Sequence, residues 1–70
     1  MSWIETPDSS NIARYKYDNK ARVLTVEFKK GGTYNYYDVP QAVYDQLNAA
    51  ASKGQFLAQS IKGAFRYARA

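Results

Sequence analysis

Two alternating segments joined by a pair of glycines limit most strongly what this chain can fold into. In residues 22–29, RVLTVEFK, apolar and polar side chains alternate, which is typical of a strand with one buried face. Gly31 and Gly32 can adopt the positive φ angles of a tight two-residue turn. Residues 33–38, TYNYYD, then predict a second strand that pairs with the first in an antiparallel hairpin.

Three tyrosines in the second segment fall on different faces of the predicted sheet. Side chains alternate along a strand, so Tyr34 and Tyr36 share one face while Tyr37 points to the other. The hairpin places Tyr34 and Tyr36 beside the apolar row of the preceding strand, so we expect both in the core. Tyr37 is expected on the opposite, open face.

A further strand is predicted before the hairpin and two helices after it. Residues 12–18, IARYKYD, alternate so that Ala13, Tyr15 and Tyr17 share the inner face. Apolar residues then recur at helical spacing over 43–51 and again over 57–68.

Two pairs of polar residues have the spacing of helix-capping boxes. Asp38 with Gln41 would begin the first helix, and Ser52 with Gln55 would begin the second. The second helix would carry Lys62, Arg66 and Arg69 on one face, at spacings of 4 and 3 residues.

The helices must bury their apolar stripes, and the inner sheet face is the one large apolar surface available. We therefore predict an α+β fold, a three-stranded antiparallel meander followed by two helices packed on one sheet face. All 70 residues form one small domain. It divides into an irregular N-terminal arm at residues 1–8, a body at 9–65 and a tail at 66–70, which Gly63 can leave frayed by ending the second helix.

Several short motifs occur in a characteristic order along the body. They are Ser9-Ser10-x-Ile12, Gly32-x-Tyr34-x-Tyr36, Val39-Pro40 and Ser52-x-Gly54-x-Phe56-Leu57. In combination they resemble the KTSC domain family, a small module at the C-terminus of some lysyl-tRNA synthetases and in free-standing small proteins. The resemblance covers nearly the whole chain. RNA binding has been suggested for this family because of its attachment to a tRNA-charging enzyme.

The absence of two residue types excludes several kinds of chemistry. The chain has no His and no Cys, so it lacks an imidazole base, a thiol nucleophile and the ligands of a Cys/His zinc site. The six acidic residues have no spacing that indicates a catalytic pair. We therefore expect a protein that is not an enzyme and uses no cofactor and no metal.

The N-terminal segment MSWIETPDSS is acidic and has no apolar run, so it does not resemble a signal peptide. No stretch approaches about 18 consecutive apolar residues, the minimum for a membrane span. We expect a cytoplasmic protein without a membrane partner, either a monomer or a weak homo-oligomer.

The positive charges are concentrated in two parts of the chain. Residues 12–30 carry six basic and two acidic side chains, and residues 53–70 carry four basic and no acidic ones. Two basic blocks favour an anionic partner. The partner itself, a protein or RNA, is left open.

Binding to another protein is the leading hypothesis, as an interaction module, an inhibitor or an accessory subunit. Seven tyrosines exceed what a small core can bury with satisfied hydroxyls, and tyrosine and arginine are enriched at interfaces. The edge of the predicted strand 12–18 or 33–38 could accept a partner strand.

The alternative hypothesis is binding of RNA or other single-stranded nucleic acid through the open sheet face, where an exposed tyrosine would lie among basic residues. A second basic cluster would lie on the last helix. The candidate binding residues under both hypotheses are Tyr37, Arg14, Lys16, Lys29, Lys30, Lys62, Arg66 and Arg69.

Two smaller features have a functional and a structural interpretation. The glycine turn in residues 29–33, KKGGT, could hold a phosphate, but a hairpin turn with solubilising lysines is the favoured interpretation. Ser9 and Ser10 could form a polar pocket with Lys53 and Gly54, although capping of a turn is favoured there.

Overall fold

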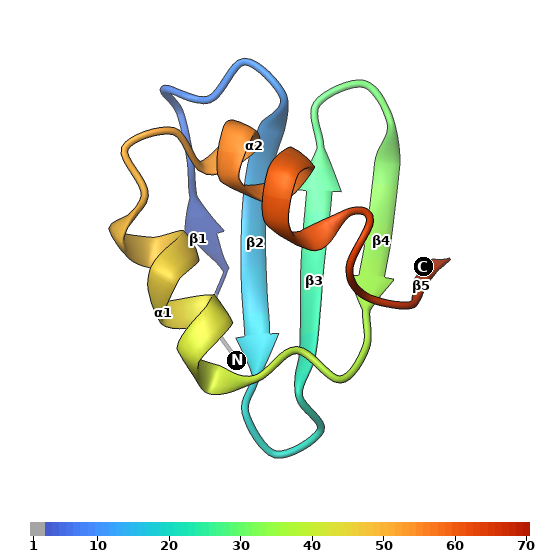
Figure 1. Ribbon diagram of the computed structural model, residues 1–70. Helices are drawn as coiled ribbons and strands as arrows, with labels where there is room; N and C mark the ends of the chain where they lie inside the picture. The colour runs from blue at the N-terminus through green and yellow to red at the C-terminus, as the bar shows by residue number, and fades with distance from the viewer. Residues whose placement is uncertain (1–2) are drawn as a thin grey trace.

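The computed structural model describes residues 3–70 and contains one sheet with helices on one of its faces. The five strands are antiparallel and lie in the order of the chain. Their bounds are β1 Ile4–Glu5, β2 Ile12–Asp18, β3 Val23–Phe28, β4 Gly32–Tyr36 and β5 Tyr67–Arg69. Between β4 and β5 come α1 (Gln41–Ala49), α2 (Lys53–Phe56) and the π-helix η1 (Leu57–Ile61), all on the same side of the sheet (Figure 1).

The α+β class and the helices on one sheet face are confirmed, but the prediction of a three-stranded sheet was wrong. The two additional strands come from the segments predicted as an irregular arm, 1–8, and a frayed tail, 66–70. Ile4 in β1 lies opposite Tyr15, and Tyr67 in β5 lies opposite Tyr36. Strands of two and three residues are too short to show an alternating pattern in a sequence. Residues 1–2 of the arm lie outside the described residues.

A β-bulge in β2 changes which residue enters the core at its start. Ile12 lies opposite Phe28 and Arg14 lies opposite Glu27, so Ala13 has no partner on β3. As a result Ile12, with no exposed surface, is buried, while Ala13 is only partly buried. The strict alternation predicted from the sequence put Ala13 on the inner face instead.

Two tyrosines of β2 form the middle of the core and fix the first helix. The hydroxyl of Tyr15 donates to the side-chain oxygen of Asn48 in α1, and the hydroxyl of Tyr17 donates to the backbone carbonyl of Val39. The ring of Tyr17 also stacks on that of Tyr44 in α1, with ring centroids 4.5 Å apart. The other fully or nearly fully buried core residues are Ile12, Leu24, Val26, Tyr36, Val39, Leu47, Leu57 and Ile61.

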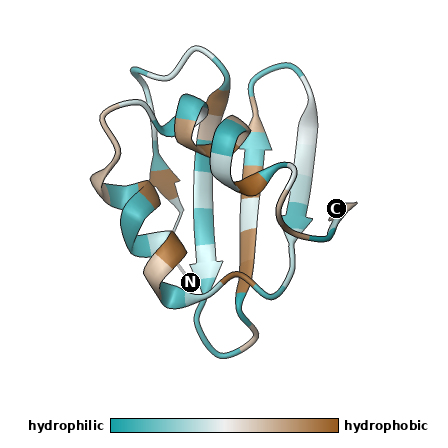
Figure 2. Ribbon diagram, viewed as in Figure 1, coloured by the Kyte–Doolittle hydropathy of each residue, from teal (hydrophilic) through white to brown (hydrophobic). Residues whose placement is uncertain are grey.

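Strands β3 and β4 differ in hydropathy because β4 has tyrosines at its inward positions. Figure 2 shows brown, hydrophobic segments along β3, whereas β4 is mostly pale or teal. The inward residues of β3 are Leu24, Val26 and Phe28, while those of β4 are Tyr34 and Tyr36. A phenol ring is apolar in its body and polar at its tip, so β4 can face both the core and water.

One of the two predicted helix caps is present. The hydroxyl oxygen of Ser52 accepts from the backbone amide of Gln55 at 3.4 Å, which confirms the cap of α2. The cap predicted at Asp38 was wrong, because α1 begins after Pro40 and Asp38 adopts a left-handed φ of 59°. Gln41 bonds to Asp45 instead of reaching back to Asp38.

The second helix is shorter than its apolar pattern predicted. After one turn of α-helix it continues as η1, in which the amide of Lys62 donates to the carbonyl of Leu57 at 2.9 Å. The chain then leaves the helix, and residues 67–69 pair with β4 as β5. Arg66 and Arg69 therefore do not lie on a helix, contrary to the sequence-based expectation.

The buried tyrosines predict a loss of stability in alkali. Burial, with a smaller contribution from Tyr44, raises the pKa of Tyr15 from 10.0 to about 12, and burial likewise raises the pKa of Tyr17 and of Tyr36. The unfolded chain ionises first, so this stabilisation is present below pH 10 and is lost as the pH rises toward 12.

We expect the free energy of unfolding, measured in urea by circular dichroism, to fall across this interval. Tyr15→Phe should flatten the fall and cost about 1 kcal/mol at neutral pH through the lost hydrogen bond. An identical alkaline profile in the variant would contradict this assignment.

Candidate aromatic and basic binding pocket

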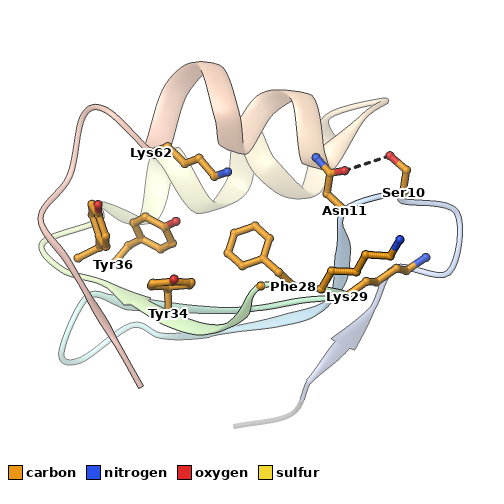
Figure 3. Close-up of a pocket in the computed structure, with 10 residues that line it drawn as sticks. Ser10, Asn11, Phe28, Lys29, Tyr34, Tyr36 and Lys62 are labelled. Atoms are coloured by element: carbon orange, nitrogen blue, oxygen red, sulfur yellow. Dashed lines mark hydrogen bonds between the residues drawn. The ribbon is translucent and has the colours of Figure 1, made fainter.

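The helices leave part of the sheet uncovered on their own side. In Figure 1 they lie in front of β1, β2 and β3, whereas most of β4 stays open. The space beside the last helix forms a pocket of about 560 Å³, which we call the aromatic pocket (Figure 3). Its lining residues are Ser10, Asn11, Phe28, Lys29, Lys30, Gly31, Tyr34, Tyr36, Lys62 and Tyr67.

Four rings from three strands make up the apolar part of this pocket. Phe28 and Tyr34 meet edge to face, with centroids 5.8 Å apart, and Tyr34 and Tyr67 meet in the same way at 5.9 Å. Tyr36 lies deepest, at 3% exposed, whereas Tyr67 is 56% exposed at the rim. In Figure 3 the rings of Phe28, Tyr34 and Tyr36 form a row along the sheet beneath Lys62. Phe28 and Tyr34 are only partly buried, so part of their ring surface faces the pocket.

Lysines surround these rings, and none of the lining residues is acidic. The ammonium of Lys62 lies 5.1 Å from the centroid of the Phe28 ring, within the range of a cation–π interaction. Lys29 donates a hydrogen bond to the backbone carbonyl of Ser9, and Lys30 is exposed in the turn between β3 and β4. The pocket therefore combines aromatic surface with positive charge.

Arg69 of β5 lies next to the pocket, against Tyr34. Its guanidinium carbon is 6.0 Å from the centroid of the Tyr34 ring. The same group packs over Gly32, where an added Cβ would lie only 2.9 Å from a guanidinium nitrogen. Gly32 also has a φ of 84°, so this position needs glycine both for space and for backbone conformation.

The structure divides the eight predicted binding residues among three places. Lys29, Lys30 and Lys62 line the aromatic pocket, with Arg69 beside it. Arg66 lies over the ring of Tyr37 at 5.3 Å and forms an exposed 3.8 Å ion pair with Asp38. The remaining two residues, Arg14 and Lys16, lie on the open face of the sheet.

The predicted open-face cluster does not form. Arg14 and Lys16 lie 4.1 and 4.6 Å from the ring of Trp3, and Arg14 is paired with Glu27 at 2.9 Å. Tyr37 follows the C-terminal end of β4, whereas Lys29 lies in the turn before its N-terminal end. The grouping of these residues around Tyr37 was therefore wrong, because strand length separates them.

Ser9 and Ser10 combine both of the roles considered for them. The hydroxyl oxygen of Ser9 accepts from the amides of Asn11 and Ile12, at 3.3 and 3.0 Å, and so caps the turn before β2. Both serines also line a second, mainly polar pocket of about 720 Å³, which includes Lys53 and Gly54. Glu5 and Asp8 lie in this pocket as well, so its charge is mixed.

Sequence reasoning missed the aromatic half of the site. It assigned Tyr34 to the core and gave Tyr67 no role. The pairing of β5 with β4 places Tyr67 opposite Tyr36, and no local pattern around residues 67–69 indicates it. Within residues 3–70 no cluster of three acidic side chains could hold a metal ion, and no helix has the length and apolarity to cross a membrane.

Known proteins resemble this chain over most of its length. Residues 8–65 match the family model of the KTSC domain. Over 61 residues, 87% of the chain, it is 43% identical to a lysine–tRNA ligase of Trichormus variabilis and 41% identical to one of Nostoc punctiforme. These matches span only 11% of each ligase.

Two further relatives have nearly the same length as the matched region. A protein of Tsukamurella paurometabola is 42% identical over 59 residues, which cover 84% of this chain and 88% of that protein. The crystal structure of a KTSC domain protein from Yersinia pestis superposes with a TM-score of 0.93 at 33% identity, covering 99% of this chain and 96% of that one. The fold thus occurs both within ligases and as most of a short chain.

The contact between Arg69 and Gly32 predicts different effects for two glycine substitutions. Gly32→Ala should lower the free energy of unfolding by about 1–2 kcal/mol, because alanine is strained at positive φ and its methyl group displaces Arg69. Gly63→Ala is the matched control: a Cβ there meets nothing within 4 Å, so stability should stay unchanged or rise by about 0.5 kcal/mol. Urea titration measures both. Equal effects would contradict the close packing at Gly32.

Proposed function

The chain belongs to the KTSC domain family, and from this premise and the geometry of its pocket we propose that it is a non-enzymatic module that binds single-stranded RNA. The observation that carries the proposal is the composition of the aromatic pocket. Four aromatic rings and three lysines line it, without an acidic residue. This is the combination that proteins use to hold unpaired nucleotides.

Each half of the pocket suits one part of a nucleotide. An unpaired base can stack on the exposed phenol ring of Tyr67 or on the partly buried ring of Tyr34, because every base has a flat π surface. The phosphates on either side of that base would meet Lys29 and Lys30 at one end of the pocket. A volume of about 560 Å³ lies within the usual range for small-ligand sites, about 300–1,000 Å³, so it can hold a single base.

The open face of the sheet supports nucleic-acid binding less well. The charge of Arg14 is already compensated by Glu27, at 2.9 Å. The ring of Trp3 is occupied by Arg14 and Lys16, which lie over it at 4.1 and 4.6 Å. We therefore assign the RNA site to the helix side of the sheet rather than to the face predicted from the sequence.

The relatives give independent support for an RNA partner. The lysine–tRNA ligases that resemble this chain act, by their name, on a transfer RNA. This makes tRNA the first candidate ligand for a segment that accompanies such an enzyme. A protein partner remains the other prediction from the sequence, and its support lies at a different place, the outer edge of β5.

A salt titration with matched lysine variants tests the proposal. We expect a fluorescein-labelled oligouridine of about 12 nucleotides to bind, with an affinity that falls steeply between about 50 and 200 mM salt. Lys30→Glu should weaken binding about tenfold and flatten the salt slope by about 0.7 per lost phosphate contact. Lys20→Glu makes the same charge change in the exposed turn between β2 and β3, away from the pocket, and should have little effect. Equal losses in the two variants would indicate only a nonspecific response to net charge.

Two tyrosine variants distinguish the pocket from the open face. Tyr34→Leu keeps apolar bulk but removes the stacking surface, so it should weaken RNA binding by about 1–2 kcal/mol. Tyr37→Leu, measured by the same fluorescence anisotropy, should leave the affinity unchanged. If Tyr37→Leu weakened binding and Tyr34→Leu did not, the assignment to the aromatic pocket would be wrong.

A further inference from the structure

The outer edge of β5 has unpaired backbone groups of its own. The carbonyl of Arg66 and the amide of Ala70 each form a hydrogen bond of 2.8 Å toward β4. Alternate residues of an antiparallel strand bond to the same neighbour. The backbone N–H and C=O groups of Tyr67 and Arg69 therefore point away from β4, and among the described strands none lies beyond β5.

The side chains of this edge are unusually exposed. All three residues of β5 are exposed, and Tyr67 keeps 56% of its surface accessible. The other exposed large hydrophobic residue among residues 3–70 is Ile4, at 36%, on the opposite edge strand β1. Exposed apolar surface beside unpaired backbone groups is the arrangement that accepts an added strand.

The two edges differ in charge. Around β5 the chain carries Arg66 and Arg69, and residues 53–70 contain no acidic residue. Among residues 3–70, the ion pair that reaches this segment joins Asp38 to Arg66 at 3.8 Å, and both side chains are about three-quarters or more exposed to solvent. The edge at β1 instead carries Glu5, with Asp8 close behind it in sequence. An acidic partner is therefore attracted to β5 and not to β1.

From these observations we propose that β5 binds an extended acidic segment of another protein, which adds to the sheet as a sixth strand. Tyr67 and Arg69 are two residues apart and point to the same face, so the partner would present an apolar or aromatic side chain next to Tyr67 and a carboxylate next to Arg69. These two partner residues would also be two positions apart. The proposal goes beyond RNA binding, because it uses backbone groups outside the aromatic pocket.

A second copy of the chain is a poorer occupant of this edge. It would bring its own Arg66 and Arg69 to the same place and double the positive charge there. The formal net charge of each chain is +4, which adds to the repulsion. An acidic segment neutralises the charges instead.

Titration with a short peptide tests the proposal on the full chain. The probe is a peptide of sequence Gly-Thr-Glu-Thr-Phe-Thr-Gly, added to the isotopically labelled protein and followed by NMR. Paired antiparallel to β5, it places its glutamate opposite Arg69 and its phenylalanine opposite Tyr67. We expect the largest amide shifts, and slower hydrogen exchange, at Tyr67 and Arg69. Methylating the backbone nitrogen of the peptide glutamate removes one strand hydrogen bond, leaves the protein unchanged, and should weaken binding roughly tenfold.

A charge exchange between the partners tests the side-chain contact. Arg69→Glu should weaken binding of this peptide roughly fivefold. A peptide with lysine in place of glutamate should restore the affinity for that variant. Lys29→Glu, in the aromatic pocket, should not change the affinity for either peptide. This control distinguishes the edge from the proposed RNA site, so each proposal can fail without the other.

Four results of the peptide titration would overturn the proposal. They are the absence of saturable shifts, shifts centred on β1, shifts centred on Lys29 and Lys30, and an affinity that backbone methylation leaves unchanged. Self-association of the free protein through β5 that the peptide does not reverse would equally overturn it, in favour of a second copy as the occupant.

Discussion

The position of the first helix depends on two buried phenol groups. A buried hydroxyl without a partner costs roughly 1–3 kcal/mol, so Tyr15 and Tyr17 must each find an acceptor inside the protein. They find Asn48 in α1 and the carbonyl of Val39 just before it. Together with the stacking of Tyr17 on Tyr44, these bonds hold α1 over β2. With α1 fixed there, the second helical segment packs over β2 and β3, and the helix side of β4 stays open. The aromatic pocket is thus a consequence of how the core satisfies its tyrosines.

How much the sequence can predict depends on whether a pattern is local. The strands around Tyr15, Val26 and Tyr36 and the first helix follow from alternation and helical spacing, and the structure has them close to the predicted ranges. The second helical segment is also present, but it ends at Ile61, earlier than its apolar pattern predicted. Short edge strands have no such pattern. The strand at Tyr67 forms by pairing with β4, and its partner residues lie about 30 positions earlier in the chain. The bulge at Ala13 is likewise set by pairing rather than by residue type.

The sequence identified the charged residues of the candidate site but did not show that they lie together. Lys29, Lys30 and Lys62 were identified from the sequence, but on two different surfaces. They come together because η1 ends at Ile61 and turns Lys62 toward Phe28. Tyr34 was assigned to the core because of its register with Val26, and the predicted face of the sheet is correct. On that face, however, Tyr34 lines the pocket. The alternating pattern shows which face of the sheet a side chain is on, but it does not show how far the helices extend across that face. The extent of the helices decides whether an inward side chain is buried or lines a pocket.

The π-helix also bears on how such a site can change during evolution. A π-turn has one residue more than an α-turn and holds that residue within a single turn of the helix. Loss of one residue between Leu57 and Ile61 would give the hydrogen bond from the Lys62 amide to the Leu57 carbonyl α-helical spacing, so Lys62 would keep its place near Phe28. The sheet and the tyrosine contacts of α1 would stay as they are, since neither involves this segment. Related sequences could therefore lose or gain one codon within this turn and still keep both the fold and this cation of the pocket.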